Sequence, residues 1–288
     1  MKHAGSIWPD GIRTVVALTF LVESWSEGKA PPYSPMTSPP KPGAIDRAGI
    51  QWSEYGARAG AYRLMRIAKQ HQLPATFCVS ARAAELFPAV VKQIVASGFE
   101  LAGHNYAQDQ VLPGLGEAEE RSLIKRSLDI LERQSGMRPC GWISSTIATT
   151  ERTADLLAEA GMLWHGDYNY LDLPCRVPAG GRTLVAIPHS DYADNRVLRG
   201  APRDFYQCYK DMFDFLYAQE PDGFINITVH GHFGGRPLLS AVLDQLLRYI
   251  AGHPGVWFPR HDELARWVNE HEIDEISYAE RFFPEGAA

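Results

Sequence analysis

The chain has 288 residues, of which 45% are hydrophobic and 22% charged, and its formal net charge is -6 at neutral pH. This length and apolar content can bury a substantial core, and we expect a single α/β domain over residues 1–288. The negative charge and the absence of a basic run argue against nucleic acid or an anionic membrane as partner, so a small-molecule ligand is expected.

The first apolar segment, Thr14 to Val22, is expected to form a strand. It is too short to cross a bilayer and lacks the small-residue cleavage site of a secretory signal, so a cytoplasmic location is expected. The cysteines are widely spaced without a Cys-x-x-Cys pair, a pattern typical of reduced thiols rather than of a disulfide framework or a zinc knuckle. They are Cys78, Cys140, Cys175 and Cys208.

Six prolines lie between Lys29 and Gly43, at positions 31, 32, 35, 39, 40 and 42. Proline lacks the amide proton and locks φ, so this stretch is expected to be neither helix nor central strand. Residues 29–43 are therefore predicted to form an irregular surface loop, which either belongs to the mouth of a substrate site or serves as a disordered linker.

Helical and strand patterns alternate over the rest of the chain. The expected helices are 53–70, 82–97, 117–134, 150–160, 203–218, 238–251 and 262–270, and the expected strands are 75–79, 99–103, 141–144, 162–165, 183–188, 224–229 and 256–259. Gly98, Gly136, Gly161 and Gly252 follow helical runs, where a left-handed residue closes the last turn. The alternation predicts parallel strands and a distorted (β/α) barrel of about seven strands, with an open doubly wound sheet as the rival.

Polar residues end almost every apolar run, and in such a barrel the active site lies at the carboxyl ends of the strands. These residues are Glu23 and Glu27, His104 and Gln108, Ser144 and Ser145, Asp167, His189 and Asp191, and His230 and His232. Side chains alternate along a strand, so His230 and His232 are expected to face the same side. They suit metal ligation, acid–base chemistry or substrate binding, although a pair of surface histidines before a turn is the plainer alternative.

Hydrolysis by an activated water fits this set better than a nucleophilic serine, because no Gly-x-Ser-x-Gly elbow occurs. The base would be Glu23, His104 or His230. Arg58 and Arg236 would hold charge that develops on a carbonyl oxygen, unless they form structural ion pairs.

Several motifs resemble the polysaccharide deacetylase (NodB-like) superfamily, and most closely its cofactor-free allantoinase and cyclic-imide hydrolase branch. Residues 54–60 (Glu-Tyr-Gly-Ala-Arg-Ala-Gly) resemble that branch's Glu-Tyr-Gly-x-Arg-x-Gly helix start. Residues 138–142 resemble its Arg-Pro-x-Gly-Trp motif, residues 172–174 its Asp-Leu-Pro, and residues 235–237 its Gly-Arg-Pro after a histidine. The resemblance implies a barrel of seven strands and a homo-oligomer.

The sequence departs from the superfamily where metal-dependent deacetylases bind zinc. Their Asp-Asp pair after Thr-Phe is replaced by Leu21-Val22, and their second motif histidine is replaced by Gln108, four residues after His104. Neutral Gln is a poor zinc ligand, so no cofactor is expected. A rearranged zinc site made of Glu23, His104 and His230 is the alternative.

The resemblance and these departures predict a hydrolase of non-peptide carbon–nitrogen bonds that opens a small cyclic amide, ureide or imide. Glu23 or His104 would activate water, and His230 and His232 would protonate the leaving nitrogen or bind the carbonyl oxygen. Arg58, Trp142, Asp167, His189 and Arg236 would bind the substrate, although core packing is the commoner fate of a tryptophan. The alternatives are an N-acetyl sugar deacetylase with a rearranged metal site and an inactive barrel that binds a small ligand.

Overall fold

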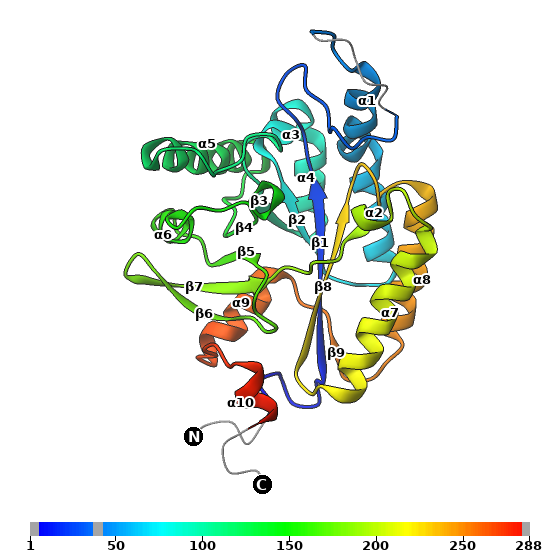
Figure 1. Cartoon of the computed structure of the whole chain (residues 1–288), viewed down its shortest axis with the longest axis vertical. Helices are drawn as coiled ribbons and strands as arrows, with labels where there is room; N and C mark the ends of the chain where they lie inside the picture. The colour runs from blue at the N-terminus through cyan, green and yellow to red at the C-terminus, as the bar shows by residue number, and fades with distance from the viewer. Residues whose placement is uncertain (1–5, 37–42, 284–288) are drawn as a thin grey trace.

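A computed structural model describes residues 6–36 and 43–283, and its centre is one mixed sheet (Figure 1). The sheet has the order β6-β7-β5-β4-β3-β2-β1-β8, with β9 also paired to β1. Every pairing is parallel except the β6–β7 hairpin. The strands are β1 (Thr14–Val22), β2 (Thr76–Val79), β3 (Glu100–Gly103), β4 (Gly141–Trp142), β5 (Trp164–Tyr168), β6 (Cys175–Ala179), β7 (Arg182–Pro188), β8 (Gly223–His230) and β9 (Val256–Trp257).

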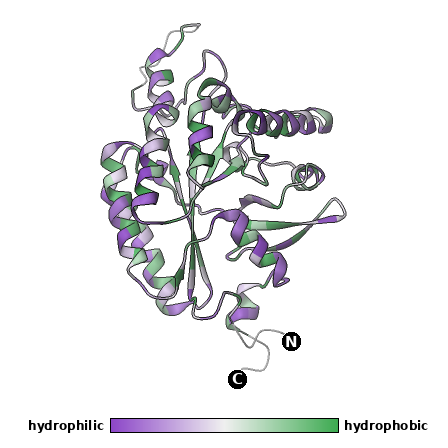
Figure 2. Ribbon diagram, turned by 180° about the vertical axis from the view of Figure 1, so that it is seen from behind, coloured by the Kyte–Doolittle hydropathy of each residue, from purple (hydrophilic) through white to green (hydrophobic). Residues whose placement is uncertain are grey.

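The strand β1 forms the centre of the sheet, and all nine of its residues are buried. It pairs with β8 from Thr14 to Leu21 along one edge, and its other edge is shared by β9 at the start and β2 at the end. Burial on both faces explains why β1 and β8 read as continuous apolar runs rather than as alternating ones. In Figure 2 these central strands are green, whereas the outer helices carry purple faces.

Helices α2, α7, α8 and part of α5 pack on one face of the sheet with Val16, Leu18 and Phe20 of β1, whereas α9 packs on the opposite face with Val15 and Ala17. The helices are α1 (Arg47–Tyr55), α2 (Ala61–Gln70), α3 (Ala81–Leu86), α4 (Pro88–Ala96), α5 (Glu117–Ser135), α6 (Thr153–Glu159), α7 (Pro202–Gln219), α8 (Pro237–Ala251), α9 (His261–Glu270) and α10 (Tyr278–Phe282). Short 3-10 turns lie at Ser145–Ile147 (η2) and Asp194–Val197 (η3), and a π-helical turn, η1 (Gly56–Gly60), joins α1 to α2.

The predicted distorted (β/α) barrel is confirmed, and it is open on one side. Within the described residues the sheet ends at β6 and β8, so no ladder joins the β7 side to β8. The connection from β7 to α7 crosses this gap and touches β8 through one isolated bridge, Ala193 to Thr228 (Figure 1). We call the gap between β7 and β8 the seam.

Some local predictions were wrong for identifiable reasons. The single helix expected over 82–97 breaks at Phe87, because Pro88 cannot continue the hydrogen-bond ladder and starts α4 instead. The β6–β7 hairpin was missed. Its turn is Gly180-Gly181, with φ of +54° and +75°, as tight hairpin turns require. Gly252 was expected to be left-handed but has φ of -75°.

The helices of the described residues include none that is both long and apolar enough to span a bilayer.

Candidate active site

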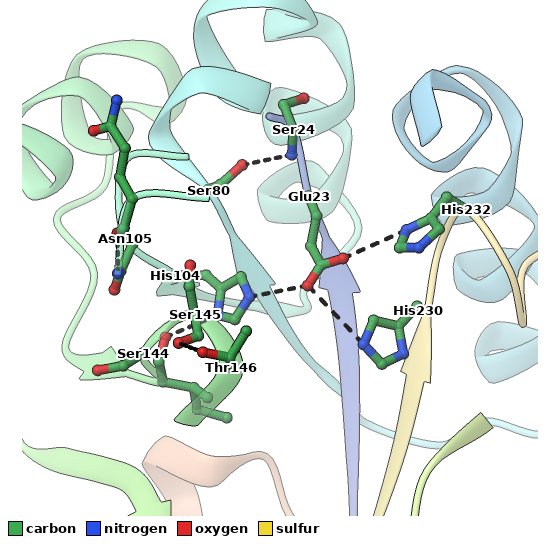
Figure 3. A network of polar contacts seen from close by, with 12 residues as sticks. Glu23, Ser24, Ser80, His104, Asn105, Ser144, Ser145, Thr146, His230 and His232 are labelled. Atoms are coloured by element: carbon green, nitrogen blue, oxygen red, sulfur yellow. Dashed lines mark hydrogen bonds and ion pairs between the residues drawn. The ribbon is translucent and has the colours of Figure 1, made fainter. Parts of the chain in front are cut away.

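Three parallel strands deliver their terminal polar residues to one point (Figure 3). Glu23 follows β1, His104 follows β3 and His230 ends β8. Glu23 Oε1 lies 3.2 Å from His104 Nε2 and 4.0 Å from His230 Nε2, while Glu23 Oε2 lies 3.5 Å from His232 Nδ1. Residues separated by more than 200 positions therefore surround one buried carboxylate, as the polar strand ends predict.

Glu23 is an anion held by imidazoles. Its side chain is fully buried, and burial by itself would raise its pKa. The surrounding histidines, led by His230, outweigh that penalty and lower the pKa of Glu23 to about 2. The carboxylate is consequently ionised across the physiological range, and its charge is balanced locally rather than by solvent.

His230 is positively charged because it lies between two carboxylates. Its Nδ1 donates to Asp194 Oδ1 at 2.5 Å, and Asp194 Oδ2 accepts the backbone amides of His230 and Gly234 at 2.8 and 2.9 Å. Burial would lower the pKa of His230, but Asp194 and Glu23 together raise it to about 9. Asp194 was missed in the sequence because it follows no apolar run; η3 brings it beneath β8.

His104 has a fixed tautomer. Its Nδ1 lies 2.8 Å from the carbonyl oxygen of Ile143, which can only accept, so Nδ1 carries a proton. Nε2 then faces Glu23 Oε1 at 3.2 Å, so the imidazole and the carboxylate are within hydrogen-bond distance and act as a pair.

His232 lies behind Glu23 and is packed among aromatic rings. Its ring centroid is 4.8 Å from Trp52 and 5.5 Å from Trp25, and Tyr33 places its hydroxyl 3.3 Å from Nε2. Burial lowers the pKa of His232 to about 3, so the ring is neutral. His232 supports Glu23 from the side away from the cavity, which differs from the expected contact with substrate. Tyr33 belongs to the proline-rich loop, of which residues 37–42 lie outside the described residues.

A cavity of about 370 Å³ opens in front of Glu23, His104 and His230. We call it the reaction cavity. Its other lining residues include Tyr33, Gln108, Ser144, Thr146, Ile147, Asn169, His189, Asp191, Asn195 and Arg196. This volume suits a small polar molecule. Among the expected substrate-binding residues, His189 lines the cavity; burial lowers its pKa to about 4, and its Nδ1 has no hydrogen-bond partner.

One wall of the reaction cavity is a strained turn. Thr146 and Ile147 have φ of +57° and +56°, a region that β-branched residues rarely occupy. The preceding Ser144 amide donates to both carboxylate oxygens of Asp167, at 2.8 and 3.1 Å, and Asp167 is also bonded to His165 at 2.7 Å. Asp167 thus anchors the turn from behind instead of meeting the substrate. Strain of this kind persists where surrounding structure enforces it, commonly at functional sites.

Three expected substrate-binding residues lie elsewhere. The guanidinium of Arg58 is largely exposed, pairs with Glu54 at 2.9 Å and lies over the Phe87 ring. Arg236 donates to the carbonyls of His232 and Trp52 and lies 4.2 Å from the Tyr55 ring centroid. Trp142 is fully buried and packs in the core, which was the alternative to a role in substrate binding.

The glycines of the 54–60 motif bring η1 against the loop that carries His230 and His232. A Cβ on Gly60 would lie 1.9 Å from the Gly231 carbonyl oxygen, and one on Gly56 would lie 2.8 Å from the His232 amide nitrogen. On the other side, a Cβ on Gly235 would lie 2.3 Å from the same Gly231 oxygen. Glycine is required here because two backbones touch. The motif therefore positions the histidines, whereas its arginine does not reach them.

The residues present do not reproduce the superfamily's zinc site. Leu21 and Val22 are apolar, and Gln108 offers only an amide. The alternative ligand set, Glu23, His104 and His230, does come together. Across residues 6–36 and 43–283, however, no three or more His, Cys, Asp or Glu side chains are arranged to hold a metal ion.

Comparisons with known proteins agree with this fold. The family model described as polysaccharide deacetylase matches residues 54–164. A peptidoglycan deacetylase of Helicobacter pylori is 24% identical over 259 residues, covering 76% of this chain and 84% of that protein. The structure of a probable polysaccharide deacetylase from Pseudomonas aeruginosa is 29% identical with a TM-score of 0.83, covering 95% and 97% of the two chains.

The structure of PuuE allantoinase is similar to the same degree: it is 27% identical with a TM-score of 0.81, covering 98% of this chain and 96% of that chain. Its likeness agrees with the resemblance of residues 54–60 and 235–237 to the allantoinase branch. The motifs, the open barrel and these similarities together show that the chain is similar to polysaccharide deacetylases and to PuuE allantoinase, and that its residues 54–164 match the polysaccharide deacetylase family.

Proposed function

We propose that this protein is a hydrolase of non-peptide carbon–nitrogen bonds that opens a small cyclic amide, ureide or imide without a bound metal. The observation that carries the proposal is the convergence of Glu23, His104 and His230 at the wall of the reaction cavity. This arrangement offers an anionic base and a cationic acid a few ångströms apart, which is what addition of water to an amide carbonyl requires.

In the proposed reaction the Glu23–His104 pair accepts a proton from the attacking water. A carboxylate whose pKa is about 2 is a weak base by itself, so the assignment includes the His104 imidazole, whose Nε2 lies 3.2 Å from Glu23 Oε1. The water oxygen bonds to the carbonyl carbon, the carbon–nitrogen bond breaks, and the imidazolium of His230 gives its Nε2 proton to the leaving nitrogen. Proton return from the Glu23–His104 pair to His230 restores the starting state.

Metal-independent chemistry is supported by the donor set, because Leu21 stands where the resemblance implies the base of metal-dependent deacetylases, and Val22 and Gln108 stand where it implies two metal ligands. The second candidate is a deacetylase of N-acetyl sugars with a rearranged zinc site. The name of the Helicobacter pylori relative, a peptidoglycan deacetylase, favours it.

A substrate panel separates the two candidates. Protein purified without added metal is analysed for its elements, treated with a chelator and assayed on allantoin, hydantoin, succinimide and phthalimide. Turnover that survives chelation supports the proposal. Inactivity on all four, with zinc-restored activity on an N-acetylated sugar, supports the deacetylase instead.

We further propose that the protein works in the cytoplasm as a homo-oligomer. The thiols of Cys78, Cys140, Cys175 and Cys208 are free, which suits a reducing compartment. Light scattering after gel filtration tests the assembly, and a monomer at micromolar concentration would contradict it.

A further inference from the structure

A second cavity of about 300 Å³ lies at the seam, beneath the connection from β7 to α7. We call it the seam cavity. Its lining includes Leu171, Leu173, Pro188, Met212, Phe215 and Leu216, together with residues 223–226 at the start of β8. It therefore lies beside the lower half of β8, whereas the reaction cavity lies at the carboxyl end of the same strand.

The two cavities share a wall. Asn169, His189, Ser190 and Asp191 line both of them. His189 is half-buried, and its buried Nδ1 has no hydrogen-bond partner. A buried imidazole nitrogen without a partner is costly unless a ligand or water satisfies it. The shared wall thus contains an unused polar atom at the place where a molecule extending from one cavity to the other would pass.

The chemistry of the seam cavity differs from that of the reaction cavity. Its apolar lining consists mainly of leucine, methionine, phenylalanine and proline side chains, whereas the reaction cavity is lined by Glu23, His104 and His230. Its charged groups are Asp172, Asp191, Glu220 and Arg281, and Glu220 accepts the hydroxyl of Tyr278 at 2.8 Å. Three carboxylates against one guanidinium disfavour an anionic occupant, so the lining suits an apolar group without negative charge.

We propose that the seam cavity is a subsite for an apolar, uncharged substituent on the ring that is opened in the reaction cavity. The inference rests on the proposed function and extends it, because the substrate class becomes a ring substituted by an alkyl or aryl group. The ring would lie against Glu23 and His230, with one of its polar atoms facing His189 Nδ1 and the substituent below the β7–α7 connection.

A series of ring substrates tests the subsite. Hydantoins that carry hydrogen, methyl, isobutyl or benzyl on the ring carbon are compared by kcat/KM. Each buried CH2 group is expected to raise kcat/KM about fourfold. A carboxymethyl group of similar size is expected to give no gain, because of the acidic lining. A flat or falling series would overturn the proposal.

A cavity-filling variant tests whether the gain from the ring substituent arises in the seam cavity. Met212→Trp occupies the seam cavity, and it is expected to abolish the gain from the benzyl group while leaving the unsubstituted ring unchanged. Met137→Trp, the same replacement at a half-exposed site after α5, is the matched control. Thermal unfolding of both variants verifies that they fold. Retention of the benzyl gain in a folded Met212→Trp protein would contradict the subsite.

The series also separates the two proposals if nothing turns over. Absence of turnover for every ring contradicts the proposed function. Calorimetric binding of the same compounds to the wild type and to Met212→Trp then decides the subsite, which fails if the benzyl compound binds both proteins equally or binds neither.

Discussion

His230 and His189 face the same cavity from the two sides of the seam; His230 is buried and His189 is half-buried. Burial pushes the pKa of each downward. His230 nevertheless has a pKa of about 9, because Asp194 and Glu23 lie beside it, while His189 has a pKa of about 4. The same residue type thus supplies a cation on the β8 side of the cavity and a neutral ring on the β7 side.

The difference shows how one small cavity can carry out proton transfer and still accept an uncharged ring. On the β8 side His230 lies between the carboxylates of Asp194 and Glu23, so charge is created and held before substrate enters. On the β7 side the imidazole has an unsatisfied nitrogen, which makes it suited to binding rather than to donating a proton. Three substitutions test this contrast.

Replacement of the central carboxylate should have the largest effect. Glu23→Gln removes the anion that the imidazoles hold, and kcat is expected to fall by roughly 10²- to 10⁴-fold, the usual contribution of a positioned base. Steady-state kinetics on the active ring substrate measures this. Glu27→Gln changes an exposed carboxylate four residues later and serves as control. Near-normal turnover by Glu23→Gln would remove Glu23 from the reaction.

Removal of the Asp194 carboxylate should lower the pKa of His230 and so make it more like His189. Asp194→Asn is expected to lower the pKa of His230 from about 9 toward its ordinary value, so kcat/KM falls about tenfold at pH 8 and little at pH 6. In the wild type, the stability gained from this raised pKa is fully present below pH 6.5 and lost as pH rises through about 9. Histidine NMR titration measures the shift. Asp204→Asn, at an exposed site on α7, is the control.

The smallest effect is expected on the β7 side. The pKa of His189 is lowered to about 4 in the folded protein. Between pH 6.5 and 4 this histidine therefore binds a proton in the unfolded chain but not in the folded one, and the free energy of unfolding falls as the pH drops. His189→Gln should reduce the number of protons taken up on unfolding by about one, so the decline becomes shallower, and it should leave stability at pH 7 little changed. Urea unfolding across this pH range checks it, with the exposed His271→Gln as control. Equal slopes in both variants would mean that His189 is not held neutral.

Much of the fold was predictable because apolar runs report buried parallel strands directly. The runs over 14–22, 183–188 and 224–229 correspond to β1, β7 and β8 within two residues at each end. The β6 strand was missed because it is short and only partly buried, although its Gly-Gly turn was a usable signal. Pro88 signalled the break at Phe87, but the helical periodicity over residues 82–97 was given more weight in the prediction.

The site was predictable where it depends on strand ends, and not where it depends on loops. Glu23, His104 and His230 converge because parallel strands place their carboxyl ends together. Asp194 reaches the site only through the path of the β7–α7 connection, which no periodicity encodes. Arg58 was misassigned because a motif shows that a residue matters without showing whether its side chain or the neighbouring glycine backbone is used.

The contact between Gly60 and the Gly231 carbonyl leaves no space for a side chain at position 60, and a Cβ on Gly231 would lie 3.2 Å from the Gly56 backbone. The 144–147 turn and the 189–196 crossing segment line the reaction cavity without taking part in this contact, so we expect changes in substrate selectivity to occur there. A library meant to redirect the enzyme would randomise those two stretches and keep the helix side invariant.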